Sequence, residues 1–189
     1  MSDKPVASGK SSIDLIDKDK TFEAIDVVSD SSFLDLACGV GRYSTEIAAR
    51  IGEQGIVYAI DLWEEGIAAL NQVVESKSIN NIKAMVADMS SRLPLEDSSI
   101  DACLLSTILH DLSKLDQNSA MQEVFRVLKP GGILNIIEFK KVEKGPGPPI
   151  KIRLDEKEVE ELLSPYGLVK TKFLEIGEYI YLVKYQKSV

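Results

Sequence analysis

Short apolar segments alternate with amphipathic segments along most of this chain, and this alternation restricts the fold more than any other feature. Five segments have the length and composition of buried strands, and these are 33–37, 56–60, 82–87, 100–105 and 132–139. Segments with helical periodicity lie between several of them, at 43–50, 64–76 and 117–128. Because strands that alternate with helices pair in parallel, the sequence predicts a doubly wound α/β sheet with helices on both faces.

The C-terminal part of the chain completes this sheet. A linker with several Gly and Pro residues, 140–152, leads to a helix that begins after Asp155. Two further apolar segments, 168–175 and 179–185, lie on either side of a glycine and predict an antiparallel hairpin. The predicted sheet therefore has seven strands and is mostly parallel, with an antiparallel strand from this hairpin.

The N-terminal part differs in composition from the rest of the chain. Residues 1–19 are rich in Ser, Lys and Asp, which predicts a flexible N-terminal arm or lid. A short helix is expected over 21–28, where apolar residues recur at helical spacing. Residues 20–189 are then expected to form a single domain.

Composition excludes several classes of protein. The 30 acidic residues outnumber the 22 basic ones and give a net charge of −8, which disfavours nucleic acid as a partner. No apolar run approaches the ~18 residues that span a bilayer, and residues 1–20 lack the apolar core of a signal peptide. We therefore expect no membrane span and a cytoplasmic location, where Cys38 and Cys103 stay reduced. Oligomeric state is not predicted.

Acidic residues occur where three successive predicted strands end. Asp35 precedes the glycine loop of Gly39 and Gly41, whereas Asp61 and Asp88 directly follow the next two strands. Because the carboxyl ends of parallel strands share one edge of a sheet, these groups are expected to line one ligand site. The glycines let the backbone approach a ligand, and the helix after them offers free N–H groups to a carboxylate.

Two cofactors suit a glycine loop of this kind. A dinucleotide needs a third glycine where this chain has Ser44, and its pyrophosphate would be repelled by Asp35. S-adenosylmethionine carries an ammonium and a sulfonium, which an aspartate attracts. Asp61 lies at the spacing from the loop at which a carboxylate binds the hydroxyls of a ribose. The sequence therefore favours S-adenosylmethionine, with S-adenosylhomocysteine as product, over a nicotinamide dinucleotide.

Several motifs resemble those of the class I S-adenosylmethionine-dependent methyltransferases, in particular the small-molecule, ubiquinone-methyltransferase-like group. The motifs are Phe33 to Gly41, Val57 to Asp61, Ala87 to Met89, Leu93 to Leu95 and Val124 to Gly132. The resemblance implies a Rossmann-like fold over residues 33 to 185. One departure is Ala37, where the family usually has a glycine, and an alanine is tolerated there if its φ is negative.

The resemblance also implies the positions of the cofactor contacts. The residues expected to bind S-adenosylmethionine are Asp35, Ala37, Cys38, Gly39, Gly41, Asp61, Leu62, Asp88, Met89 and Ser106. Among them, Asp61 would accept hydrogen bonds from the ribose, Leu62 and Met89 would flank the adenine, and Asp88 would bind its amino group. Ser106 would lie beside the sulfonium.

Two residues are candidates for the methyl acceptor side. His110 is the only histidine, and its pKa range suits a general base, although a structural role is the alternative. Glu138 ends the fifth predicted strand and would either orient the acceptor or be solvated. Because no acidic residue except adjacent Asp111 is placed to orient the imidazole, we expect catalysis mainly by positioning, without a base. No metal site is expected.

Three functions are compatible with these observations. The favoured one is methyl transfer from S-adenosylmethionine to a small-molecule acceptor by in-line displacement. A nicotinamide-dependent oxidoreductase and a non-catalytic module that binds S-adenosylmethionine are the alternatives.

Overall fold

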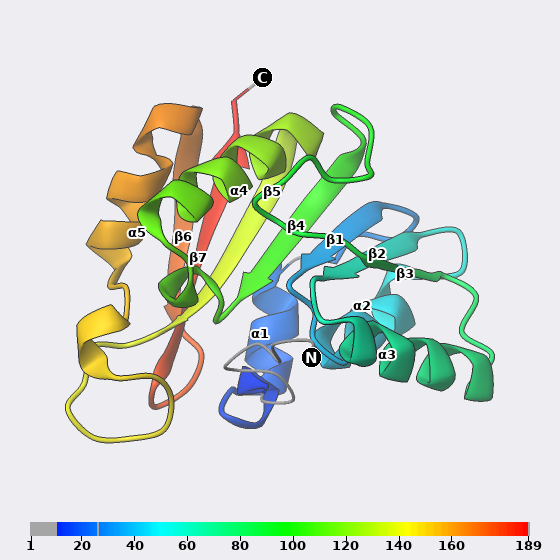
Figure 1. Ribbon diagram of the computed structural model, residues 1–189, viewed down its shortest axis with the longest axis horizontal. Helices are drawn as coiled ribbons and strands as arrows, with labels where there is room; N and C mark the ends of the chain where they lie inside the picture. Colours follow the sequence, from blue (N-terminus) through cyan, green and yellow to red (C-terminus); the bar gives the residue numbers. More distant parts are fainter. Residues whose placement is uncertain (1–10, 26, 189) are drawn as a thin grey trace.

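The computed structural model describes residues 11–25 and 27–188, and these form a seven-stranded sheet with helices on both faces (Figure 1). The strands are β1 Ser32–Leu36, β2 Ile56–Asp61, β3 Ile82–Val86, β4 Ile100–Ser106, β5 Leu128–Phe139, β6 Leu168–Glu175 and β7 Ile180–Lys187. Their order is β3-β2-β1-β4-β5-β7-β6, and only β7 runs antiparallel to its neighbours. This arrangement confirms the predicted seven-stranded, mostly parallel sheet and its C-terminal hairpin.

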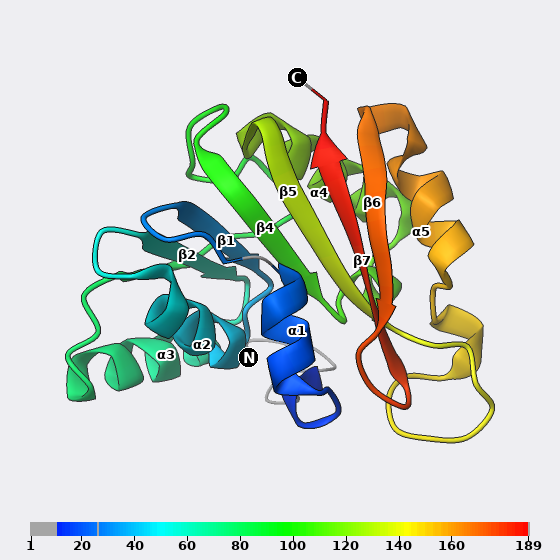
Figure 2. The same ribbon diagram turned by 180° about the vertical axis from the view of Figure 1, so that it is seen from behind.

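The helices divide between the two faces of the sheet. They are α1 Lys18–Ile25, α2 Arg42–Ile51, α3 Glu64–Ser76, α4 Lys114–Val127 and α5 Glu156–Leu163. Alternate residues of β1 point to opposite faces, so Leu34 packs in the cluster that includes α4 and α5, whereas Phe33 packs with α1 and α2. Figure 2 shows α1 in front of the lower ends of β4 and β5, on the face opposite α4 and α5.

The connection between β3 and β4, residues 87–99, forms no helix, and the sequence predicted none there. These residues form an irregular segment with several turns and bends that buries Met89 and Leu93 in the same cluster as α4. Arg126 of α4 fixes this segment, since its guanidinium donates to the carbonyl oxygens of Leu93 and Leu95 at 3.2 and 2.9 Å. Backbone carbonyls that a helix would satisfy internally are thus satisfied by a side chain.

Residues 11–19 of the predicted flexible arm have a defined conformation, and residues 1–10 lie outside the described residues. Ser12–Asp14 form a 3-10 turn, η1, in which Ser12 and Ile13 are buried. The N–H of Asp17 then donates to the carbonyl of Ile176, and α1 begins at Lys18 rather than at Thr21. The polar composition of this segment concealed three apolar side chains that pack on the core, namely Ile13, Leu15 and Ile16.

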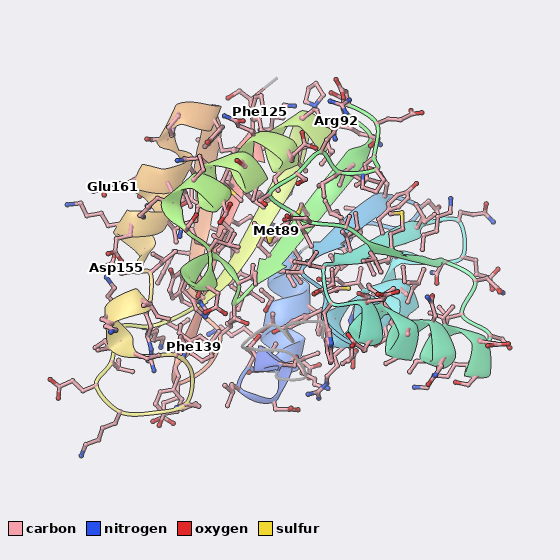
Figure 3. The ribbon with its side chains drawn as sticks, in the orientation of Figure 1. Met89, Arg92, Phe125, Phe139, Asp155 and Glu161 are labelled. Atoms are coloured by element: carbon pink, nitrogen blue, oxygen red, sulfur yellow. The ribbon has the colours of Figure 1, made fainter. Side chains whose placement is uncertain are left out.

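The linker 140–152 is held by one side chain that the sequence pattern did not reveal. Arg153, which is buried, donates to four carbonyl oxygens, those of Lys140, Val142, Pro146 and Pro148, at 2.8 to 3.4 Å. Its guanidinium also lies 5.5 Å from the centroid of the Phe139 ring. Figure 3 shows Phe139 beside this linker, at the end of β5.

The helices among the described residues are all too short or too polar to span a bilayer.

Candidate functional site

The loop between β1 and α2 has an unusual backbone conformation. Ala37, Gly39 and Gly41 all have positive φ, at 64°, 58° and 73°. The expectation of a negative φ at Ala37 is therefore wrong, and the alanine adopts a left-handed conformation that favours glycine. A Cβ on Gly41 would lie 2.4 Å from Leu70 Cδ1, whereas one on Gly39 would meet no atom within 4 Å. Gly41 is thus required by packing, and Gly39 borders open space.

Asp61 fixes this loop as well as facing the predicted site. One of its carboxylate oxygens, Oδ2, accepts from the N–H of Gly39 at 2.7 Å, and the other accepts from the N–H of Trp63 at 2.8 Å. The carboxylate at the end of β2 therefore joins the loop after β1 to the start of α3. Each oxygen keeps a further lone pair for a ligand hydroxyl.

Asp35 lies beneath the loop and is 2% exposed. Its carboxylate accepts a hydrogen bond from the hydroxyl of Ser44, and no basic side chain among the described residues pairs with it. Burial raises the pKa of Asp35 to about 7, an effect that the Ser44 hydrogen bond only partly offsets. A buried carboxylate without a cation suits a ligand that supplies one.

A small pocket of about 50 Å³ brings several predicted residues together. Its lining includes Ser11, Ser12, Asp35, Ala37, Cys38, Gly39, Val40, Arg42, Tyr43, Ser106 and Thr107. The pocket therefore joins the ends of β1 and β4, as expected for Asp35 and Ser106. It also includes two serines of the N-terminal segment, which the sequence did not assign to the site.

The N-terminal segment closes this pocket through specific contacts. The Ser12 hydroxyl lies 3.0 Å from the Tyr43 hydroxyl and 2.9 Å from the Ser106 hydroxyl. Asp14 pairs with the guanidinium of Arg42 through both carboxylate oxygens. The pair is solvent-exposed and adds little stability, so the buried hydroxyl contacts are the more specific ones.

The residues predicted to contact the adenine do not line this pocket. Leu62 is 61% exposed, whereas Met89 is buried. Figure 3 shows Met89 on the connection that crosses the sheet after β3. Asp88 accepts from the N–H and hydroxyl of Ser90 through Oδ1, and the N–H of Ala87 donates to the carbonyl of Asp61. The three residues therefore follow β2 and β3 along the same edge of the sheet as the pocket.

The two acceptor-side candidates are in direct contact. His110 Nδ1 lies 2.7 Å from Glu138 Oε2, and the carboxylate of Glu138 is fully buried. The expectation that only Asp111 could orient the imidazole is therefore wrong, because Glu138 does so from β5. The solvated alternative for Glu138 is also wrong.

The charges around His110 shift its protonation equilibrium. Burial alone would lower the pKa of His110, but the hydrogen bond and charge of Glu138, with the charge of Asp111, outweigh it. The pKa of His110 therefore lies above its ordinary value of 6.5, despite an opposing charge from Arg153. A pair of this kind holds one imidazole nitrogen as a donor to the carboxylate.

Sequence reasoning missed several residues of the site, and their signals were weak. Trp63, the only tryptophan, packs beside Gly66 and follows Asp61 by two residues. Gln117 is buried on α4 and donates to the carbonyl of Leu109 at 2.7 Å, next to His110. The sequence signal for Gln117 was that a polar residue stands on the apolar face of a predicted helix. In the described part of the chain, no cluster of three His, Cys, Asp or Glu residues could hold a metal ion.

Comparison with known proteins places these features in one family. The model of a family described as "Methyltransferase domain" matches residues 33–132, more than half of the chain. A demethylmenaquinone methyltransferase of Bacillus mycoides is 29% identical over 119 residues, which are 63% of this chain and 49% of that protein. A ubiquinone/menaquinone biosynthesis C-methyltransferase of Yersinia enterocolitica is 32% identical over 108 residues, 57% of this chain and 42% of that protein. The chain spans about half the length of these curated relatives.

A solved structure agrees over nearly the whole fold. The crystal structure of an S-adenosylmethionine-dependent methyltransferase from Aquifex aeolicus has a TM-score of 0.85 and 28% identity, and it covers 95% of this chain and 94% of its own. The family match covers the loop after β1, the ends of β2 to β4 and the start of β5. The chain therefore belongs to the methyltransferase domain family and has the fold of the S-adenosylmethionine-dependent enzymes.

Proposed function

We propose that this protein transfers a methyl group from S-adenosylmethionine to a small-molecule acceptor. When bound, the cofactor supplies a methyl group on a positively charged sulfur, which departs as a neutral thioether. The observation that carries the proposal is the buried Asp35 carboxylate, which lines the pocket and pairs with no basic side chain among the described residues. An ammonium group placed there would supply the missing cation.

The residues around Asp35 fit the rest of the cofactor. Gly41, the N-cap of α2, provides no side-chain cap, so we expect the N–H groups of Arg42 and Tyr43 to bind a carboxylate, whereas the N–H of Ser44 already donates to Asp35. Asp61 has lone pairs for ribose hydroxyls. Asp88 and Met89 follow the next strand, where an adenine would lie, and the exposed Leu62 would cover the ring.

Binding requires the N-terminal segment to move. The pocket of about 50 Å³ is far below the ~300–1,000 Å³ of sites for ligands of this size. Ser12 occupies the space next to Ser106, where the sulfonium is expected. Displacement of residues 11–14 would open the pocket, and their return would exclude water from the reacting groups.

The net charge of the chain and the names of its curated relatives suggest which class of acceptor to test first. With a net charge of −8, the surface disfavours phosphate backbones, so we expect a free small molecule as the acceptor. A cytoplasmic setting stays part of the proposal. The curated relatives are named for methylation in quinone biosynthesis, which makes quinols one class to test. A non-catalytic module would bind the same cofactor, so only turnover distinguishes it.

Calorimetry with S-adenosylmethionine, S-adenosylhomocysteine and NADH tests the first half of the proposal. We expect micromolar binding of the first two, on the order of −7 to −8 kcal/mol, and no competition by NADH. Release of S-adenosylhomocysteine in the presence of quinols, phenols, thiols, carboxylates and amines tests the second half. Tighter binding of NADH would refute the proposal, and cofactor binding without turnover on any acceptor would favour the binding module.

A further inference from the structure

We propose that Glu138 and His110 form a proton-accepting pair, so that the acceptor carries a proton on the atom that is methylated, as an un-ionised hydroxyl does. This inference rests on the proposed methyl transfer. It replaces the expectation of catalysis without a base, which assumed that no acidic residue orients the imidazole.

The first argument is the tautomer that the contact imposes. A carboxylate can only accept, so at 2.7 Å from Glu138 Oε2 the Nδ1 atom of His110 must carry a hydrogen. In the neutral imidazole the lone pair is then on Nε2, which becomes the basic atom. Glu138 Oε1 also lies 3.4 Å from the N–H of His110, so the same carboxylate holds both the ring and its backbone.

The second argument is that the ring is fixed while Nε2 makes no hydrogen bond to the described residues, in a side chain that is 4% exposed. The imidazole packs edge-on against Phe139 with 5.9 Å between ring centroids, and Gln117 anchors the carbonyl of the preceding residue, Leu109. In the part of the chain that the structure describes, Nε2 makes no hydrogen bond, and Asp111 Oδ1 lies 3.7 Å from it. An oriented imidazole with an unused lone pair is the arrangement of a general base.

The third argument is position. His110 belongs to a 3-10 turn, η2 (Leu109–Asp111), which begins two residues after Thr107 of the pocket lining. The N–H of Thr107 donates to the carbonyl of Ile137 at 2.7 Å, so the ends of β4 and β5 are joined between the pocket and the pair. Neither residue of the pair lines the pocket, but the pair lies after β4 and at the end of β5, along the same edge of the sheet as Ser106.

The proposed step balances as follows. The hydroxyl oxygen of the acceptor gives its proton to Nε2 of His110 and uses the freed electron pair to form the bond to the methyl carbon. The electron pair of the broken carbon–sulfur bond remains on sulfur, which leaves uncharged. The imidazolium that forms is stabilised by Glu138, and it returns the proton to water before the next turnover.

Groups from three elements set the pH response of the pair. Glu138 of β5 and Asp111 of η2 favour the charged imidazole, whereas Arg153, which precedes α5, opposes it. Since the base must be neutral to accept a proton, turnover is expected to rise as pH increases through a pKa above 6.5.

Nuclear magnetic resonance of the single histidine tests the pair without any acceptor. In a chain without a histidine tag, all imidazole signals come from His110. We expect the Nδ1–H tautomer in the neutral form and a pKa that Glu138→Gln lowers by about 1 to 3, as expected for loss of an adjacent opposite charge. Asp111→Asn is the control and should lower the pKa less. An Nε2–H tautomer, or a pKa unchanged by Glu138→Gln, would overturn the proposal.

Turnover on two phenols tests the acceptor class, with one phenol un-ionised and the other already ionised at the assay pH. His110→Gln should slow methylation of the un-ionised phenol by about 10²–10⁴-fold and remove the rising limb of its pH profile. Methylation of the ionised phenol should change by only a few-fold. Equal losses on both, or no turnover of any phenol by wild-type protein that binds S-adenosylmethionine, would overturn the assignment. If the wild type binds no S-adenosylmethionine, the proposed function fails instead.

Discussion

The proposed cofactor end and the proposed acceptor end of the site are held together in different ways. At the cofactor end, around β1 and β2, backbone conformation and backbone hydrogen bonds shape the site. Ala37, Gly39 and Gly41 have positive φ, and two backbone N–H groups donate to Asp61. At the acceptor end, side chains from separate elements join, as His110 does with Glu138. Backbone conformation leaves a pattern of glycines in the sequence, whereas a contact between distant side chains leaves none.

Asp61→Ala is expected to have the largest effect on cofactor binding, and it would act on the cofactor end alone. Loss of a charged acceptor for the ribose should weaken S-adenosylhomocysteine binding by about 2–3 kcal/mol, or roughly 30- to 150-fold in Kd. The variant should also unfold at lower urea concentration, because the N–H groups of Gly39 and Trp63 lose their partner. Calorimetry and urea titration measure the two effects.

Asp61→Asn is the matched control, since its amide oxygen can still accept from one of these N–H groups. It should retain more stability than Asp61→Ala while losing a similar part of the affinity. Wild-type affinity in Asp61→Ala would contradict the ribose assignment.

Arg153→Ala tests the linker 140–152, which Arg153 holds near the His110–Glu138 pair. Four carbonyl oxygens of the linker lose their donor, so the free energy of unfolding should fall by about 2 kcal/mol. Residues 140–152 should become sensitive to limited proteolysis, while S-adenosylhomocysteine affinity stays near the wild-type value. Arg153→Lys should recover little, because a single ammonium cannot reach four acceptors in a fixed plane. A large loss of cofactor affinity would show that the two ends are coupled.

Asp35 predicts a pH dependence that belongs to the cofactor end. Its pKa is about 7 in the folded protein and 3.8 as the reference value, so the folded state keeps a proton that the unfolded state loses. Stability contributed by this group therefore falls as pH rises from about 4 to about 7. The difference in unfolding free energy between wild type and Asp35→Asn should follow that trend. A difference that does not change over this range would contradict the raised pKa.

Cofactor binding should reverse the protonation of the same group. An ammonium beside Asp35 favours the carboxylate, so binding below pH 7 should release a proton, measurable by calorimetry in buffers of different ionisation enthalpy. Proton release that persists in Asp35→Asn would assign the effect to another residue.

Ala37→Gly is expected to have the smallest effect. At a φ of +64° glycine removes steric strain but loses more entropy on folding, so a gain of about 0.5–1 kcal/mol is expected. Thermal unfolding should move upward by about 1–4 °C in a domain of this size. Ala37→Val, which cannot adopt this backbone without strain, should move it downward. A lower melting temperature for Ala37→Gly would contradict the strain.

The same comparison explains how much the sequence could reveal. The alternation of strands and helices was sufficient to predict the sheet, because it depends on local patterns. The cofactor contacts assigned to Asp35, Asp61 and Asp88 stay predictions. The partnership of His110 with Glu138 was not predictable, since it depends on the register between β4 and β5. The path of 87–99 was also not predictable, because it depends on hydrogen bonds from Arg126 of α4 to the carbonyl oxygens of Leu93 and Leu95.

The hydrogen bonds of Arg153 allow the side chains of the linker 140–152 to change in evolution while its backbone keeps the same course. It binds the linker through main-chain oxygens, which every amino acid provides, rather than through side chains. Exposed positions such as Lys144 and Lys151 can therefore be exchanged without altering the course of the chain. The linker thus keeps one shape while the chemistry of its exposed side chains is free to vary.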